Sequence, residues 1–291
     1  MYSLIIFTIP LESSLGMLRM RYVFNVKRLW ILLRNIIYRK SIAIALLIVL
    51  LIYFCFADPI HYITSKGWRN PCDKAIQLLL NSNTLFLGDL HIKKNGNGNR
   101  FKCIKSFILR NNVSTLVLVG DVFDDPNIYY DLRKELGSDE AVIRYLLKIL
   151  DIEDLKLNIY FIAGGVSHDP QDMYLNVTIN DIYFQSVGKC LRLEIYSHRI
   201  IAIHGDIVVG GPFGFIITRI FNKPIFENLL RSILNIDKDT WVIMGHTHVP
   251  LIDYESRVAN TGGWTKIPIL QPPIKKGVLI TRKGVELIKI K

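Results

Sequence analysis

Cysteine is scarce in this chain, with four residues among 291. Cys55 lies in an apolar run, which leaves Cys72, Cys103 and Cys190 as an odd number that demands no disulfide framework. Internal repeats and low-complexity tracts are also absent, so a repeat architecture is excluded. Half of the residues are hydrophobic, which is ample for a buried core in one large domain or two small ones.

Basic charge is unevenly distributed. The formal net charge is +11, and residues 1–40 hold seven basic side chains against Glu12, so 7 − 1 = +6 of the total lies there. The remainder is only mildly basic, as an ordinary solvated surface is. It has no basic groove interleaved with aromatic residues, so no nucleic-acid partner is expected.

An uncharged apolar run occupies residues 41–57, next to Arg39 and Lys40. Its length is at the short end of the roughly 17 to 25 residues that cross a bilayer as a helix, and we predict a transmembrane anchor. A cleaved signal peptide and a buried core helix are the alternatives. The basic excess before the run places residues 1–40 in the cytoplasm as a single-pass N-terminus and the rest of the chain outside it.

The rest of the chain reads as a linker followed by one domain. Residues 58–82 contain Pro59, Gly67 and Pro71 and are predicted to form a juxtamembrane linker. In 83–291, buried strands alternate with helices, one after the loop 93–100 and one over 139–150, which indicates an α/β domain. Alternation in 191–196 and a hairpin over 277–290 predict more antiparallel pairing in the second half.

Five apolar runs of strand length end in Asp or His, in the stretches 84–91, 115–125, 158–169, 199–206 and 241–248. Ligands gather at the carboxyl ends of strands in open α/β sheets. Five of the seven histidines fall at these ends: His91, His168, His204, His246 and His248. Carboxylate and imidazole suit a hard or borderline divalent metal. The i, i+2 spacing of Asp89 and His91, and of His246 and His248, would put each pair on one side of an extended backbone.

The ordered series Gly-Asp-Leu-His91, Gly-Asp-Val-Phe-Asp124, Ser-His-Asp169, His204-Gly-Asp206 and Gly-His-Thr-His248 resembles the calcineurin-like metallophosphoesterase superfamily, over residues 84–264. The resemblance implies two sheets packed between helices and two divalent ions, with manganese expected and iron, zinc or magnesium as alternatives. It also implies ligand roles: Asp121 as the bridge, Asp89, His91 and His248 at the first ion, and His204 and His246 at the second.

The resemblance assigns further roles around these ligands. His168 resembles the histidine that protonates the leaving-group oxygen or binds the phosphoryl group, and Asp169 would orient its ring. Asp124 and Asp206 would hold the ligand imidazoles or loops. One position departs from the family pattern, because Ser167 stands where an asparagine oxygen usually binds the second ion. Weak binding or a different second ion would follow.

Asn260-Thr-Gly-Gly-Trp264 resembles a segment of the UDP-2,3-diacylglucosamine pyrophosphohydrolases, in which an apolar lid follows the His-Gly-Asp block. Residues 207–236 are also apolar here, and they form either a lipid-binding lid or a packed helix pair. Under the lid hypothesis Phe221 contacts lipid, and Arg219, Lys223 and Asn260 steady the phosphate or head group.

These features predict a membrane-anchored, dinuclear-metal phosphohydrolase that cleaves phosphate ester or pyrophosphate bonds. Its partners would be the lipid bilayer and a phosphorylated small molecule or a lipid-linked substrate. Two alternatives stay open. One is a catalytically weakened member that binds phosphorylated ligands or acts as a scaffold, which the serine at 167 favours. The other is a protein phosphatase or nuclease.

Overall fold

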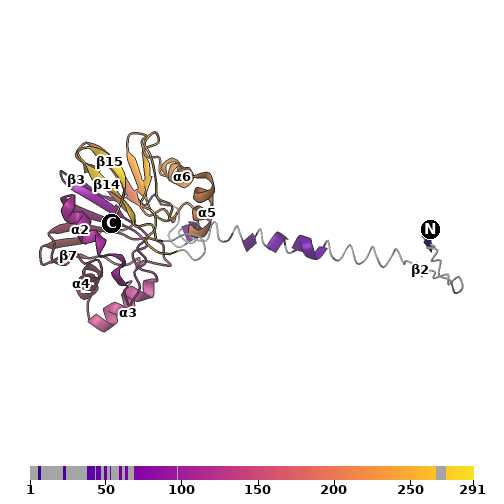
Figure 1. The fold of residues 1–291 in the computed structure, drawn as a ribbon, viewed down its shortest axis with the longest axis horizontal. Helices are drawn as coiled ribbons and strands as arrows, with labels where there is room; N and C mark the ends of the chain where they lie inside the picture. The colour runs from indigo at the N-terminus through magenta and orange to yellow at the C-terminus, as the bar shows by residue number, and fades with distance from the viewer. Residues whose placement is uncertain are drawn as a thin grey trace, which may run out of the picture. The chain divides into compact units, whose positions relative to one another are not determined.

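The computed structural model describes residues 6–7, 22–23, 38–42, 44–46, 49–50, 53, 59–60, 63–64, 69–96, 98–266 and 273–291. The chain divides into two compact units, Met1–Tyr53 and Phe54–Lys291 (Figure 1). In the first unit, β1 (Ile6–Phe7) pairs antiparallel with β2 (Tyr22–Val23). The second unit contains the α/β domain that the sequence predicts.

None of the helices formed by the described residues has both the length and the apolar character that a membrane span requires. The predicted span 41–57 lies partly outside the described residues, because 43, 47–48, 51–52 and 54–57 are not among them. The membrane anchor, the cytoplasmic N-terminus and the bilayer as partner therefore stay predictions.

Two β-sheets form the centre of the second unit. The order of the seven-stranded sheet is β15 (Gly284–Lys289), β14 (Lys276–Thr281), β4 (Asn83–Leu87), β5 (Val113–Val119), β6 (Leu157–Ile162), β8 (Ile182–Ser186) and β7 (Asn176–Ile179). The order of the six-stranded sheet is β12 (Leu251–Asp253), β13 (Val258–Asn260), β11 (Trp241–Met244), β10 (His198–Ile203), β9 (Cys190–Ile195) and β3 (Ile76–Leu80). The predicted hairpin is β14–β15, and the alternating segment 191–196 lies in β9.

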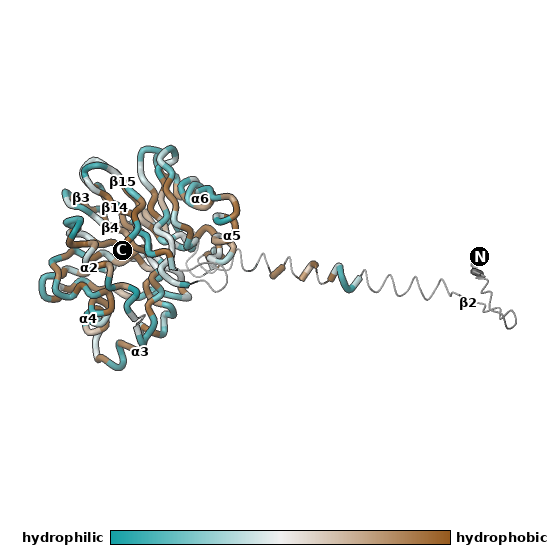
Figure 2. Tube along the Cα trace, viewed as in Figure 1, coloured by the Kyte–Doolittle hydropathy of each residue, from teal (hydrophilic) through white to brown (hydrophobic). Residues whose placement is uncertain are grey.

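Each central strand is apolar on both faces because each sheet is covered on both sides. Leu116 and Leu118 of β5 pack in one hydrophobic cluster, whereas Val117 and Val119 pack in another. The second cluster is shared with the six-stranded sheet, so it fills the space between the two sheets. The helices cover the outer faces, which gives the two-sheet sandwich expected from the sequence (Figure 2).

Three helices pack on the seven-stranded sheet: α2 (Cys103–Arg110), α3 (Pro126–Leu136) and α4 (Asp139–Ile149). The first and third were expected from the sequence, but α3 was missed. Its signals are nevertheless local. Asp125 accepts a hydrogen bond from Asn127 N as the N-cap, Pro126 opens the helix, and Gly137 ends it in the left-handed conformation.

Two helices cover the six-stranded sheet, namely α5 (Gly211–Phe221) and α6 (Ile225–Ile233). Phe226 and Leu230 of α6 are buried in the cluster that includes Ile201 and Val242 of the sheet, and Phe213 and Ile217 of α5 pack against it. Residues 207–236 thus include a packed helix pair, and their role as a lipid-binding lid stays a prediction. The hydrophobic face of a sheet must be covered, and α5 and α6 cover this one.

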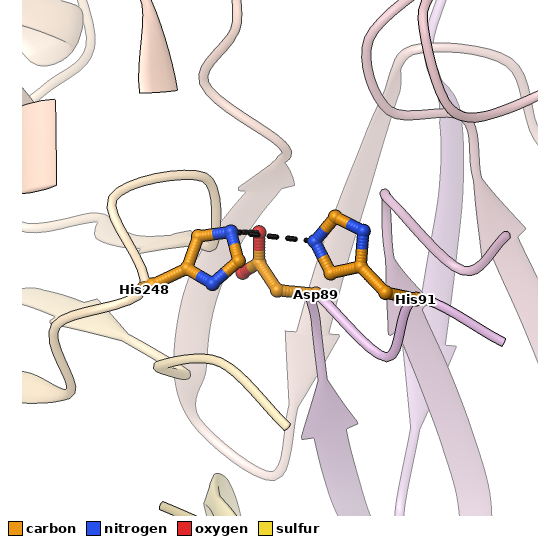
Figure 3. A group of neighbouring side chains, drawn as sticks. All are labelled: Asp89, His91 and His248. Carbon is orange, nitrogen blue, oxygen red and sulfur yellow. Dashed lines mark hydrogen bonds and ion pairs between the residues drawn. The ribbon is translucent and has the colours of Figure 1, made fainter. Parts of the chain in front are cut away.

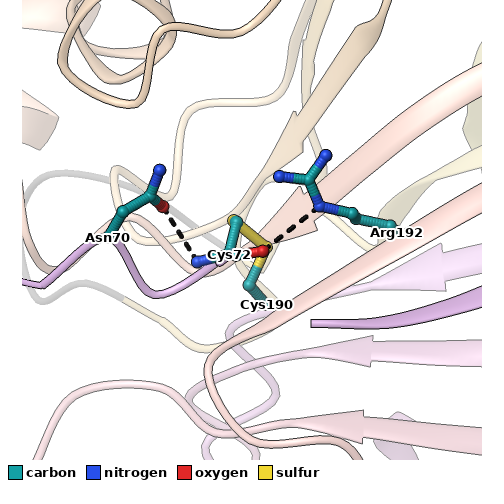
Figure 4. Close-up of a disulfide and its surroundings, with 4 residues drawn as sticks. All are labelled: Asn70, Cys72, Cys190 and Arg192. Carbon is teal, nitrogen blue, oxygen red and sulfur yellow. Dashed lines mark hydrogen bonds between the residues drawn. A yellow bond between two sulfur atoms is a disulfide. The ribbon is translucent and has the colours of Figure 1, made fainter. Parts of the chain in front are cut away.

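The predicted linker over 58–82 is too long, because its last residues belong to the folded domain. Ile76–Leu80 form β3, which pairs in parallel with β9 at the edge of the six-stranded sheet. A disulfide joins Cys72 to Cys190, the first residue of β9 (Figure 4). Cysteine counting could not find this bond, because an odd count neither requires nor excludes a single pair.

Candidate metal centre

The structure brings six of the seven predicted metal ligands together in two groups at the strand ends. Asp89, His91 and His248 form the first triad, and Asp121, His204 and His246 form the second. Within each triad, one potential ligand atom per residue lies within 4.8 Å of the others. The residues follow β4, β5, β10 and β11, so both sheets contribute. Strands β4 and β5 are parallel, as are β10 and β11, which puts their carboxyl ends at common edges.

In the first triad, the rings of His91 and His248 point toward one another beside the Asp89 carboxylate (Figure 3). The two Nε2 atoms are 3.3 Å apart, and His248 Nε2 is 3.3 Å from Asp89 Oδ1. Two nitrogen ligands at about 2.1 Å from one ion would span such a distance. Burial lowers the pKa of His91 to about 4, and burial beside His91 lowers that of His248 to about 3. Both imidazoles are therefore neutral near pH 7, as metal ligands must be.

In the second triad, the fully buried His204 has polar partners at both ring nitrogens. Its Nδ1 donates to Val119 O at 3.0 Å, while its Nε2 is 3.2 Å from Asp121 Oδ1 and 3.1 Å from His246 Nδ1. Burial alone would lower the pKa of His204, but the carboxylates of Asp121 and Asp89 raise it to about 10. Burial likewise opposes the ionisation of Asp121, yet His204 keeps its pKa well below the usual range.

These observations fit a divalent cation. Without a metal, the second triad holds a proton on His204 between buried carboxylates, and a cation there would take over that charge. The two triads are also connected, because the Asp89 carboxylate accepts hydrogen bonds from His246 N at 3.0 and 2.9 Å. Asp121 Oδ2 lies 3.8 Å from His168 Nε2, on the other side of the carboxyl from His204. The bridging role of Asp121 stays a prediction.

Five of the six triad residues have a left-handed backbone. The φ angles of Asp89, His91, Asp121, His246 and His248 lie between 46° and 68°. This conformation is uncommon for residues with a Cβ and is concentrated at functional sites. The sequence analysis expected Asp89 and His91, and likewise His246 and His248, to point to one side because of an extended backbone. That reason was wrong, because these residues have left-handed backbones.

Two glycines allow the triads to pack closely. A Cβ at Gly120 would lie 2.6 Å from the His204 ring, and a Cβ at Gly245 would lie 2.6 Å from Asp89 Oδ2. Neither atom could be accommodated without moving a triad residue. The Gly-Asp and Gly-His pairs of the sequence are thus explained by close approach as well as by the turn.

His168 and Asp169 are placed differently from one another. His168 is partly exposed, its Nδ1 donates to Asp124 O at 2.9 Å, and its ring stacks edge-on against His91 at 4.6 Å. Asp169 is fully buried and accepts from Val122 N, Phe123 N and Gly164 N at 2.7 to 3.1 Å. The prediction that Asp169 orients the His168 ring is wrong. It fixes the loop after β5, because three buried N–H groups need an acceptor.

The predicted supporting carboxylates lie beside the triads. Asp124 Oδ1 is 3.6 Å from His91 Nδ1, and Asp206 Oδ2 is 3.2 Å from Lys189 Nζ. Lys189 was missed by the sequence analysis. It also donates to Gly164 O, so it ties the loop after β10 to the loop after β6. No motif contains it, and only the fold brings it to Asp206.

Asn260 does not take the position predicted for it, whereas the role of Ser167 stays a prediction. Ser167 is exposed in the turn 165–169, and a Cβ at Gly165 would lie 3.5 Å from Ser167 Oγ and 3.8 Å from Asp121 Oδ1. Asn260 is fully buried, so it is not a substrate contact. Its Nδ2 donates to Gly245 O and Thr247 Oγ1 of the Gly-His-Thr-His loop and to Glu227 Oε1 of α6. Asn260 and Glu227 thus support the loop that carries His246 and His248.

The other predicted substrate residues lie at the far end of α5. The start of the helix is near the second triad, since a Cβ at Gly211 would be 3.7 Å from the His246 ring. Arg219 and Phe221 are in its last turn, and Lys223 follows it. At 1.5 Å per residue, Arg219 is about 12 Å farther along the axis than Gly211. The structure therefore separates these residues from the triads.

No family model matches the sequence, and no curated protein matches it. Among solved structures, the chain is similar to a Vps29 mutant from Entamoeba histolytica, with 13% identity, a TM-score of 0.39, and 71% of this chain and 97% of that chain covered. It is also similar to YfcE, a phosphoesterase from E. coli, with 14% identity, a TM-score of 0.39 and coverage of 72% and 93%. An archaeal phosphodiesterase matches with 15% identity, a TM-score of 0.40 and coverage of 71% and 98%. At these values the likeness assigns this chain neither a family nor an activity.

Proposed function

We propose that the chain is a metal-dependent phosphoesterase of the calcineurin-like type. The observation that carries the proposal is the pair of adjoining Asp/His triads at the strand ends of two packed sheets. Two neighbouring divalent ions supply Lewis acidity and a hydroxide nucleophile for attack on phosphorus, which is the chemistry that a phosphate ester or pyrophosphate needs. Manganese is proposed first, with iron, zinc and magnesium as alternatives.

The protein's own residues would then hold the substrate and move protons. His168 is the candidate general acid, because its Nδ1–H is fixed on Asp124 O and its Nε2 faces the carboxylate of Asp121. It is the most exposed ring among the five histidines of the strand ends, which suits a group that meets the leaving oxygen.

The test is a screen of the purified full chain against a phosphate monoester, a diester and a pyrophosphate, with each of the four metals and with chelator. Turnover that depends on metal is the expected result. Asp121→Asn should lose turnover and bound metal together, because the variant removes the buried charge beside His204. The matched control is Asp125→Asn at the exposed cap of α3, which should keep both. Equal turnover in the wild type and Asp121→Asn would contradict the proposal.

A binding or scaffolding member without turnover is the second candidate. The serine at 167 favours it, because this residue stands where the family pattern has an asparagine that binds the second ion. Equilibrium dialysis in the same screen separates the candidates, since a binding member would retain metal and a phosphate analogue but hydrolyse none of the substrates.

The location of the domain has support from the structure, whereas the lipid nature of the substrate rests on the sequence alone. The disulfide between Cys72 and Cys190 favours an oxidising compartment, in agreement with a domain outside the cytoplasm. A lipid-linked substrate now rests on the predicted anchor and the Asn260–Trp264 resemblance, because Arg219, Phe221 and Lys223 lie away from the triads. Protease added to intact cells should reach an extracytoplasmic domain, and protection would reverse the orientation.

A further inference from the structure

Helices α5 and α6 present large apolar side chains to solvent as well as to the core. Their exposed members are called the apolar face here: Ile216, Ile220 and Phe221 of α5, and Ile225, Leu229 and Ile233 of α6. Ile216 and Ile220 are four residues apart, as are successive members of the α6 set, which puts these side chains in one stripe per helix, and Phe221 follows Ile220 at the end of α5. Ile220 is 67% exposed and Phe221 is 57% exposed.

The apolar face is additional to the face that packs on the sheet. Phe226 and Leu230 of α6 are buried, whereas Ile225 and Leu229, one position earlier in each case, are exposed. Only Asn222, Lys223 and Pro224 separate the helices, so the stripes adjoin at this short connection. In Figure 2, the segment through α5 carries the hydrophobic colour. Six large exposed apolar side chains on two consecutive helices exceed the single scattered ones that need no explanation, and such groups mark sites of interaction.

The exposed charges of the segment 211–236, which carries the apolar face, have one sign. Between residues 211 and 236 the only carboxylate is Glu227, which is fully buried. Arg219 and Lys223 are exposed beside the stripes, whereas Arg231 donates to backbone carbonyls of Asp237, Thr240, Ser256 and Arg257. The nearest exposed carboxylates in sequence follow α6, where Asp237 and Asp239 pair with Arg199.

We propose that the apolar face docks on the surface of a lipid bilayer that contains anionic lipid. Exposed isoleucine, leucine and phenylalanine side chains would enter the boundary between head groups and acyl chains, and Arg219 and Lys223 would contact lipid phosphates. A bilayer fits better than a protein partner for two reasons. Within 211–236 the exposed charges are the cations Arg219 and Lys223 and the single carboxylate is buried, and the same chain carries the uncharged apolar run 41–57 after seven basic residues.

Docking through this face would also orient the metal centre. The buried side of α6 carries Glu227, which accepts a hydrogen bond from Asn260, and Asn260 holds Gly245 O and Thr247 Oγ1 of the loop with His246 and His248. One helix therefore touches the bilayer with one side and the support of the metal loop with the other. The inference goes beyond the proposed function and requires no turnover, so the two can fail independently.

The test measures the depth of a single tryptophan in vesicles. The full chain with Ile220→Trp is reconstituted in phosphatidylcholine with about a third phosphatidylglycerol, with and without brominated acyl chains. Leu109→Trp is the matched control, because Leu109 is 57% exposed on α2, which covers the other sheet. The signal of each added tryptophan is the difference from the unsubstituted chain, which has four tryptophans of its own.

Brominated lipid should quench the added fluorescence of Ile220→Trp at least twofold and that of Leu109→Trp hardly at all. Both side chains are exposed, so the variants should keep the circular dichroism spectrum of the wild type. Equal quenching of the two tryptophans overturns the proposal. A blue shift of Ile220→Trp that grows with protein concentration and shows no quenching by bromine also overturns it, since a second copy of the chain would then cover the face.

A separate measurement tests whether Arg219 and Lys223 contact anionic lipid. With Arg219→Gln and Lys223→Gln added to Ile220→Trp, or with phosphatidylglycerol omitted, the quenching should fall by at least half. Quenching that is the same under all three conditions overturns the role of the two cations.

Discussion

Glu227 gives a sharp prediction because it is a fully buried carboxyl group with an incomplete set of partners. Its Oε1 accepts from Asn260 Nδ2 at 2.8 Å, but its Oε2 is buried without a hydrogen-bond partner. Burial raises its pKa from 4.5 to about 7, although the bond from Asn260 acts in the opposite direction. The perturbation is Glu227→Gln, which keeps the shape and the acceptor for Asn260 but cannot ionise.

The sign follows from proton linkage. A carboxyl whose folded pKa is raised stabilises the fold fully below the unfolded pKa of 4.5, and this contribution is lost as the pH rises through about 7. The difference between a pKa of 4.5 and one of about 7 corresponds to roughly 3 kcal/mol. The free energy of unfolding of the wild type should therefore fall relative to Glu227→Gln by about 2 to 3 kcal/mol between pH 5 and pH 8. At pH 8 the variant should be the more stable protein.

Urea unfolding of both proteins at several pH values, with chelator present, measures this difference directly. Other titrating groups cancel in the comparison, provided that both proteins unfold in two states with equal m-values. Glu286→Gln serves as the control, because Glu286 is exposed on β15. A difference between wild type and Glu227→Gln that is constant from pH 5 to pH 8 would refute the reasoning from burial.

Three further predictions concern the disulfide, the loop after β5 and the second triad. Cys72 and Cys190 are 118 residues apart, and replacing both by serine should lower the free energy of unfolding by about 4 kcal/mol. A loss of less than about 1 kcal/mol in urea unfolding would contradict the presence of the disulfide. Asp169→Asn puts an amide N–H group against backbone donors and should cost about 2 kcal/mol and weaken metal binding; wild-type values for both would contradict its role. Metal affinity by competition titration should rise with pH up to about 10, because the ion must displace the proton of His204, and a flat profile from pH 6 to 9 would argue against that proton.

Much of the candidate site could be predicted from the sequence because its signals are local. An apolar run followed by Asp or His predicts both a strand and the polar residue at its carboxyl end. The carboxyl ends of such strands lie close together in an α/β sheet, so five runs predict one site. The two triads consist of the six Asp and His residues expected from the ordered blocks. The same local logic located α4 and the β14–β15 hairpin.

The remaining features depend on contacts between distant segments. Lys189 reaches Asp206 only because the loops after β6 and β10 end at the same edge of the sandwich. Glu227 and Asn260 meet only because α6 covers β13 and β11. The contacts of Lys189 and of Glu227 cannot be predicted from hydrophobic periods of 2 or 3.6 residues, which are the patterns that a single sequence displays.

Asp169 shows why residue type alone does not assign a role. A carboxylate next to a histidine can orient its ring, as the sequence suggested, or it can accept buried backbone N–H groups. The left-handed backbone at Asp121 turns the chain so that Val122 N and Phe123 N point at one carboxylate oxygen of Asp169. Those two donors and Gly164 N are buried, and leaving them unpaired would cost more than leaving the partly exposed His168 to bond a carbonyl and water. The backbone of the metal loop, not the neighbouring ring, therefore determines what Asp169 does.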